Sequence, residues 1–123
     1  MSAPAAAQDS APKDLLATLT INADHPALVG HFPGRPLVPG VVLLDEAIVA
    51  IECARGVTFG AFRLASVKFL QPVKPPAMLT VRHRASGTHD APSIDFAIED
   101  DNRSDSGPRV VASGRIDGLL PGR

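Results

Sequence analysis

Apolar and polar positions divide the chain into strands, one helix and one rigid loop. The run from Leu15 to Ile21 alternates well enough for a strand with one buried face. Alternation of the same kind returns in the second half of the chain, where polar, glycine-containing stretches separate the runs. The further strands predicted there are Phe62–Leu70, Met78–Ala85, Ile94–Glu99 and Arg109–Asp117.

One segment has the pattern of a helix. Residues 41–55 contain no Gly or Pro, are apolar on nearly all sides, and are followed by Gly56. A glycine at this place is typical of a helix end, and a helix with so few polar positions is expected to be buried. Residues 25–40, in contrast, hold four prolines and three glycines, which predicts a rigid loop leading into the helix.

The order of elements predicts an α+β domain in which an antiparallel sheet wraps around one long buried helix. Residues 14–120 form this single domain, and residues 1–13 are expected to be a disordered tail. A sheet of this size around one helix leaves edges and apolar surface uncovered. A homodimer, or a higher oligomer built from dimers, is therefore expected.

Composition excludes several classes of function. A formal net charge of −1 and only 4% aromatic residues, with no Trp or Tyr, argue against nucleic acid or anionic lipid as a partner. No segment resembles a secretory signal or a membrane span, and the single Cys53 fits a reducing cytoplasm, where we expect it to be an inert core thiol. His25, His83 and His89 are too scattered for metal ligands, and His83 is expected to be a partly buried strand residue.

Candidate chemistry lies where the loop meets the helix. Gly40 stands at the predicted helix N-terminus, where free backbone N–H groups and the helix dipole can stabilise a negative oxygen. His31 lies in the rigid loop and Asp45 on the second turn of the helix, so an imidazole and a carboxyl could converge on the same place. This combination supplies a base, an acid and an oxyanion donor.

Motifs in this region resemble the 3-hydroxyacyl-[acyl-carrier-protein] dehydratases of the FabZ and FabA types. The similar runs are Leu19–Asn22, Gly30-His-Phe-Pro-Gly34 and Pro39-Gly-Val41, and the resemblance extends over residues 17–117. Asp45 follows His31 by fourteen residues, as the catalytic carboxylate does in that family. Glu46 and Val49 depart from the family pattern and bring the chain nearer to the compact aryl-polyene-type dehydratases. The strand that precedes Leu19–Asn22 in the fatty-acid enzymes is expected to be missing here, because a short polar tail takes its place.

The resemblance implies a hotdog fold and the dehydration of 3-hydroxyacyl thioesters to trans-2-enoyl thioesters. His31 would remove the α-proton, Gly40 would bind the thioester carbonyl through its N–H, and Asp45 of the partner subunit would protonate the leaving hydroxyl. Asp45 must then be buried in an apolar tunnel that keeps it protonated. The substrate would be a thioester of acyl carrier protein or coenzyme A, with no cofactor. The residues expected to line the tunnel are Phe32, Pro39, Val41, Leu44 and Ile48.

Other interpretations remain open. Asp45 could be a satisfied polar group of the helix, and the Pro39-Gly40 pair could serve only the turn. The chain could also be a hotdog acyl thioesterase, or a non-catalytic acyl-binding or partner subunit. A set of basic residues could contact an acidic carrier protein, although exposed basic side chains are usually only solvated. This set is Arg35, Arg63, Lys68, Lys74, Arg82 and Arg84.

Overall fold

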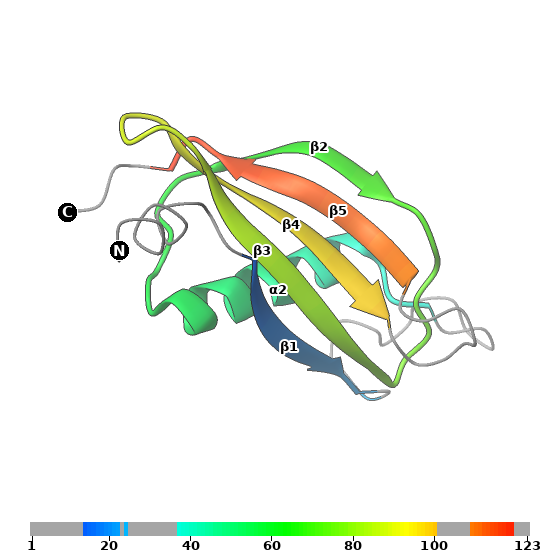
Figure 1. The fold of residues 1–123 in the computed structure, drawn as a ribbon. Coiled ribbons are helices and arrows are strands. Elements are labelled where there is room, and N and C mark those ends of the chain that lie inside the picture. The colour runs from blue at the N-terminus through cyan, green and yellow to red at the C-terminus, as the bar shows by residue number, and fades with distance from the viewer. Residues whose placement is uncertain (1–13, 23, 25–36, 101–108, 120–123) are drawn as a thin grey trace, which may run out of the picture.

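A five-stranded antiparallel sheet packs one face against one helix in the computed structural model, which describes residues 14–22, 24, 37–100 and 109–119 (Figure 1). The elements are β1 (Leu15–Ile21), α2 (Gly40–Arg55), β2 (Arg63–Phe69), β3 (Ala77–Gly87), β4 (Pro92–Asp100) and β5 (Arg109–Asp117). The strand order is β1-β3-β4-β5-β2, so β1 and β2 form the two edges. This arrangement confirms the predicted α+β class.

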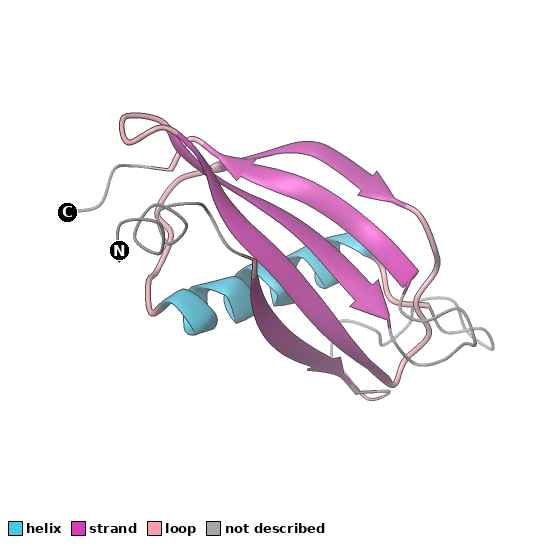
Figure 2. Ribbon diagram, viewed as in Figure 1, coloured by secondary structure: helices cyan, strands magenta, loops and turns pink. Residues whose placement is uncertain are grey.

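The core lies between α2 and the inner face of the sheet (Figure 2). Period-two alternation aims every second residue of a strand at the helix, as the sequence predicts. In β3 and β4 the buried residues of this kind are Leu79, Val81, His83, Ile94, Phe96 and Ile98. Aliphatic side chains fill most of the space, because the chain has few aromatic residues.

The helix buries only one of its faces. Val42, Leu43, Ala47, Ile48 and Ile51 are the buried residues of α2. The opposite face leaves Val41 67% exposed and Val49 52% exposed, and Cys53 is exposed as well. The expectation of a core thiol is therefore wrong for the single chain, because the sheet covers one side of the helix only.

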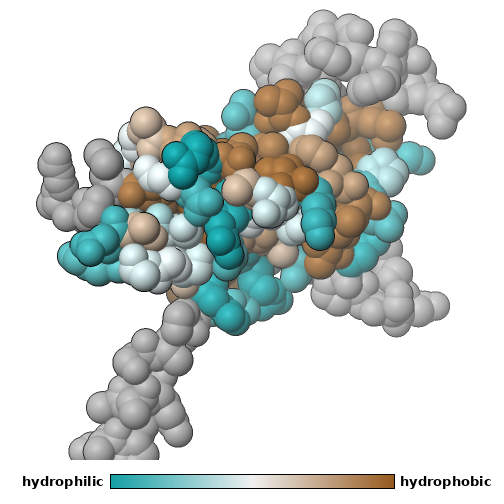
Figure 3. Space-filling view, turned by 90° about the horizontal axis from the view of Figure 1, so that it is seen from above, coloured by the Kyte–Doolittle hydropathy of each residue, from teal (hydrophilic) through white to brown (hydrophobic). Residues whose placement is uncertain are grey.

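A bulge in the edge strand β2 changes which way its last residue points. Ala65 pairs with Arg115, but Lys68 pairs with Ser113, so β2 carries one extra residue between these pairs. An extra residue reverses the alternation beyond it. Phe69 is consequently opposite the buried Ala112, on the inner face of the sheet. Figure 3 looks down on the side of the molecule that β2 borders, where apolar and polar surface alternate.

Candidate active site at the helix N-terminus

The N-terminal end of α2 has unused hydrogen-bond donors. Its N-cap residue is Pro39, which is extended and provides no capping side chain. The carbonyl of Pro39 accepts from the amides of Val42 and Leu43, at 3.0 and 3.1 Å. Among the described residues, the amides of Gly40 and Val41 have no acceptor. Within the described part of the chain, these two N–H groups are therefore open to a ligand, at the positive end of the helix dipole.

A pocket of about 360 Å³ opens at this helix end. It lies between the start of α2 and the segment that leaves β2. Its lining residues are Val38, Gly40, Leu43, Phe69, Leu70, Gln71, Pro72 and Val73. Most of this lining is apolar, which suits a ligand with an apolar body and one polar group.

Backbone hydrogen bonds fix the walls of this pocket. The amide of Val38 donates to the carbonyl of Val73 at 2.8 Å, which ties the residues before α2 to the segment after β2. The amide of Leu70 donates to the carbonyl of Val111 at 2.8 Å, which ties the same segment to β5. These two hydrogen bonds fix the pocket walls relative to the start of α2. The amides of Gly40 and Val41 therefore have a fixed position beside the pocket.

The predicted site residues are distributed between this pocket, the helix and the undescribed loop. Gly40 lines the pocket, Pro39 and Leu44 are partly buried, Ile48 is buried, and Val41 is exposed. His31 and Phe32 lie outside the described residues, so their predicted roles stay predictions. The structure also places the ring of Phe69 against Gly40. The sequence pattern does not predict this contact, because the two residues are far apart in the chain.

Asp45 is exposed in the single chain. It lies four residues from both Val41 and Val49, on the helix face that the sheet leaves uncovered. Residues at this spacing share one side of a helix. An apolar environment for the Asp45 carboxyl is therefore not provided by the described residues of this chain.

The C-terminal end of α2 is closed by contacts of its own. Gly56 has a left-handed φ of 68°, and its amide donates to the carbonyl of Cys53. Nε of Arg55 donates to Nδ1 of His83 at 3.0 Å. His83 is 1% exposed, which is more buried than the sequence suggested. Burial, and then the charge of Arg55, lower the pKa of His83.

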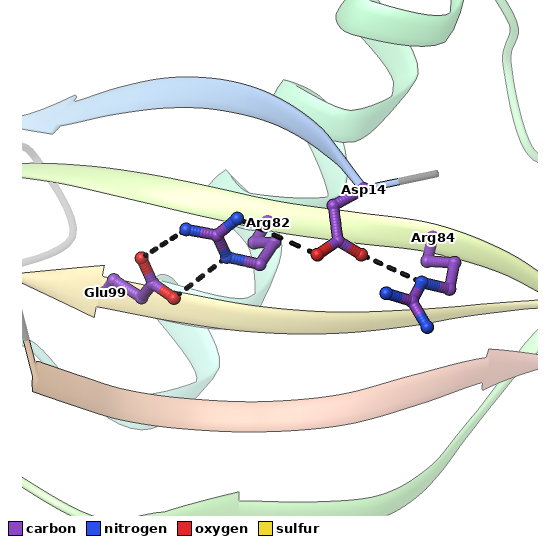
Figure 4. A network of polar contacts seen from close by, with 4 residues as sticks. All are labelled: Asp14, Arg82, Arg84 and Glu99. Atoms are coloured by element: carbon purple, nitrogen blue, oxygen red, sulfur yellow. Dashed lines mark hydrogen bonds and ion pairs between the residues drawn. The ribbon is translucent and has the colours of Figure 1, made fainter. Parts of the chain in front are cut away.

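Ion pairs on the outer face of the sheet occupy two of the basic residues considered for a carrier protein (Figure 4). Arg82 forms a two-pronged contact with Glu99, and the carboxylate of Asp14 lies between Arg82 and Arg84. Glu99 raises the pKa of Arg82 through this hydrogen bond. Both arginines therefore have partners within the chain.

The described residues contain no group of three His, Cys, Asp or Glu side chains that could hold a metal ion. Within the same residues, no helix is long and apolar enough to cross a bilayer.

Comparison with known families shows which family the chain belongs to. A model of the ApeI-like family, described as ApeI dehydratase, matches residues 7–115. The chain belongs to the ApeI-like dehydratase family. It is also 28% identical over 117 residues to the 3-hydroxyacyl-[acyl-carrier-protein] dehydratase FabZ of Chlamydia trachomatis, covering 88% of this chain and 73% of the relative. This dehydratase is thus a hydro-lyase.

Solved structures show that the ApeI-like chain has the hotdog fold. An uncharacterised protein of Erwinia carotovora subsp. atroseptica is 28% identical with a TM-score of 0.62, covering 89% of this chain and 85% of that one. The dehydratase heterocomplex ApeI:P of Xenorhabdus doucetiae matches with a TM-score of 0.58 at 20% identity, covering 89% and 94%. An acyl-CoA hydrolase of Staphylococcus aureus, solved with coenzyme A, matches with 0.59 at 14% identity, covering 89% and 71%.

Proposed function

We propose that this ApeI-like dehydratase removes water from 3-hydroxyacyl groups carried on acyl carrier protein and produces trans-2-enoyl thioesters. The observation that carries the proposal is the uncapped N-terminus of α2, where Gly40 lines a largely apolar pocket and its amide has no acceptor among the described residues. The thioester carbonyl oxygen accepts a hydrogen bond from this amide. Negative charge that develops on the oxygen is stabilised there in the transition state.

The reaction divides proton transfer between two side chains. His31 takes the proton from C2, the electron pair of that bond forms the C2=C3 double bond, and the C3–O bond breaks. Asp45 donates a proton to the leaving hydroxyl, so that water departs. His31 must be neutral and Asp45 protonated for this direction of reaction.

The site is completed by a second copy of the chain. The exposed face of α2 around Asp45 carries Val41 and Val49, which a second chain can cover. The edge strand β2 also offers unpaired backbone groups to a neighbour. A homodimer built over these surfaces would bury Asp45 and bring it to the pocket of the partner chain, in the cytoplasm we expect for this protein.

Basic residues near the pocket suit an acidic acyl carrier protein as the partner. Lys68 precedes the pocket residue Phe69, and Lys74 follows Val73. Both lysines are exposed, and neither has an ion-pair partner among the described residues. Such unpaired charges attract an acidic protein surface. Arg35, which was also considered as a contact for the carrier protein, lies outside the described residues.

Activity is tested first in the direction of hydration. Crotonyl thioesters of acyl carrier protein and of coenzyme A are offered to the wild-type protein, while enoyl absorbance and free thiol are both recorded. We expect loss of the enoyl absorbance without release of thiol, and faster reaction on the carrier protein. Release of thiol would instead indicate a thioesterase, the activity of the S. aureus hydrolase with the same fold. No reaction would indicate a binding or partner subunit, such as one member of a heterocomplex.

A mixing experiment tests whether two chains share each site. His31→Ala and Asp45→Asn should each be inactive alone. Unfolding and refolding the two variants together produces mixed dimers, in which one of the two sites has both residues intact. Recovery of about a quarter of the wild-type activity is then expected for a statistical mixture. No recovery from two folded, dimeric variants would place both residues in one chain.

A further inference from the structure

The ring of Phe69 lies against the first residue of the helix. A Cβ built on Gly40 would be 2.7 Å from Cζ and 2.8 Å from Cε1 of this ring. Carbon atoms in ordinary contact are about 4 Å apart, so the ring occupies the space where a side chain at position 40 would begin. The bulge between Ala65 and Lys68 creates this contact, because it turns Phe69 toward the helix side of the sheet.

Core packing does not account for this placement. Phe69 is 54% exposed, and the buried core is formed by other residues. Its backbone, however, is well fixed, since Phe69 pairs with Ala112 and the next amide, that of Leu70, donates to Val111. A large apolar ring is therefore held at the opening of the pocket with one edge on Gly40.

The ring edge and the reacting part of a substrate would occupy neighbouring space. A carbonyl oxygen bound by the Gly40 amide lies about 3 Å from its nitrogen, and the α-carbon is two bonds further on, within roughly 5 Å. The ring atoms nearest to Gly40 lie within a similar distance of the same nitrogen, because the Cβ position that they approach is only two bonds, about 2.5 Å, from it. A substituent on the α-carbon would compete with the ring for this space.

We propose that Phe69 is a specificity-determining residue that excludes acyl groups with a substituent on the α-carbon. This inference rests on the proposed dehydratase function. Unbranched acyl thioesters fit between the ring and the amide, whereas an α-methyl group contacts the ring edge. Groups further along the acyl chain are not affected by Phe69, because they extend away from the carbonyl.

The test compares two enoyl thioesters on the same carrier protein. Crotonyl and trans-2-methyl-2-butenoyl thioesters differ only in the α-methyl group, and hydration adds the proton of water at C2 and its hydroxyl at C3 of either one. In Phe69→Ala, kcat/KM for the methyl-branched thioester should rise about tenfold relative to crotonyl, the usual size of discrimination for one methyl group. Phe69→Leu should show a smaller rise. The ratio of trans-2-decenoyl to crotonyl should not change.

Met78→Ala is the matched control, because Met78 is a large apolar residue that is 69% exposed and lines no part of this pocket. Its ratio of branched to unbranched activity should equal that of the wild type. An unchanged ratio in both Phe69 variants, with crotonyl still hydrated, would overturn the inference and leave the proposed function intact. A wild-type protein that hydrates both thioesters equally well would also overturn the inference and leave the proposed function intact. A wild type that hydrates neither would overturn both.

Discussion

The two ends of α2 differ in how many of their polar groups form hydrogen bonds within the described chain. At the C-terminal end, Gly56 caps the helix, Arg55 donates to His83, and Glu52 accepts from the amide of Phe59 at 2.7 Å. At the N-terminal end, Pro39 offers no cap and the Gly40 amide has no acceptor among the described residues. The fold thus closes one end with its own groups and leaves the other open to a pocket.

This difference separates structural residues from functional ones. Backbone amides at a helix N-terminus that have no acceptor among the described residues, and that lie beside a pocket, can bind a negative oxygen of a ligand. Substitutions at the closed end should therefore change stability with little effect on turnover. Substitutions at the open end should change turnover with little effect on stability.

The largest effect is expected from removing the Gly40 amide. Because any Cβ at position 40 meets Phe69, the substitution is made in a Phe69→Ala background, where Gly40→Pro is compared with Gly40→Ala. Proline is tolerated at the first position of a helix, so the two variants differ mainly by one N–H group. We expect kcat for crotonyl hydration to be about 10²- to 10³-fold lower with proline.

Thermal unfolding provides the control for this pair. The two variants should unfold at similar temperatures, because the lost N–H has no partner in the described chain. Equal turnover by the proline and alanine variants would show that the Gly40 amide does not bind the thioester carbonyl. Another hydrogen-bond donor would then have to stabilise the oxygen.

A smaller effect on stability, and none on chemistry, is expected at the closed end. Gly56 has a φ of 68°, and a Cβ at this position would have no neighbouring atom within 4 Å, so Gly56→Ala is costly only through its backbone conformation. The expected loss in the free energy of unfolding is about 1 to 2 kcal/mol. Chemical denaturation measures this loss, and crotonyl hydration should continue at the wild-type rate.

Gly60→Ala is the matched control, since Gly60 also has open space around it but no left-handed φ. This variant should keep the stability of the wild type. Equal stability of both alanine variants would mean that the left-handed cap contributes nothing measurable to the closed end.

The sequence predicted those parts of the fold that depend on local pattern. The strands Leu15–Ile21 and Arg109–Asp117 and the helix end before Gly56 agree with the structure, because alternation and a glycine cap are encoded by neighbouring residues. Gly40 was found through its motif and lies at the pocket. The roles of His31 and Asp45 stay predictions.

Contacts between distant residues could not be predicted in this way. Exposure of Cys53 depends on how much of the helix a single sheet covers. The contact of Phe69 with Gly40 depends on a bulge that moves β2 by one residue, and the pair of Arg55 with His83 joins residues 28 apart. None of these follows from period or composition, because each is decided by tertiary packing.

The smallest effect is expected in the pH dependence of the closed end. The folded chain binds a proton on His83 less readily than the unfolded chain, because burial and Arg55 lower its pKa from the ordinary 6.5. The contribution of His83 to stability is therefore complete above pH 6.5, and it falls as the pH decreases toward the lowered pKa of the folded state. Protonation would also remove the lone pair that accepts from Arg55.

His83→Asn should keep an acceptor for Arg55 but remove this titration. Between the ordinary pKa of 6.5 and the lowered pKa, its midpoint of thermal unfolding should fall less with decreasing pH than that of the wild type. His89→Asn, at an exposed loop position, should retain the wild-type slope. If the His83 variant lost stability on acidification as steeply as the wild type, the acid sensitivity would belong to other groups.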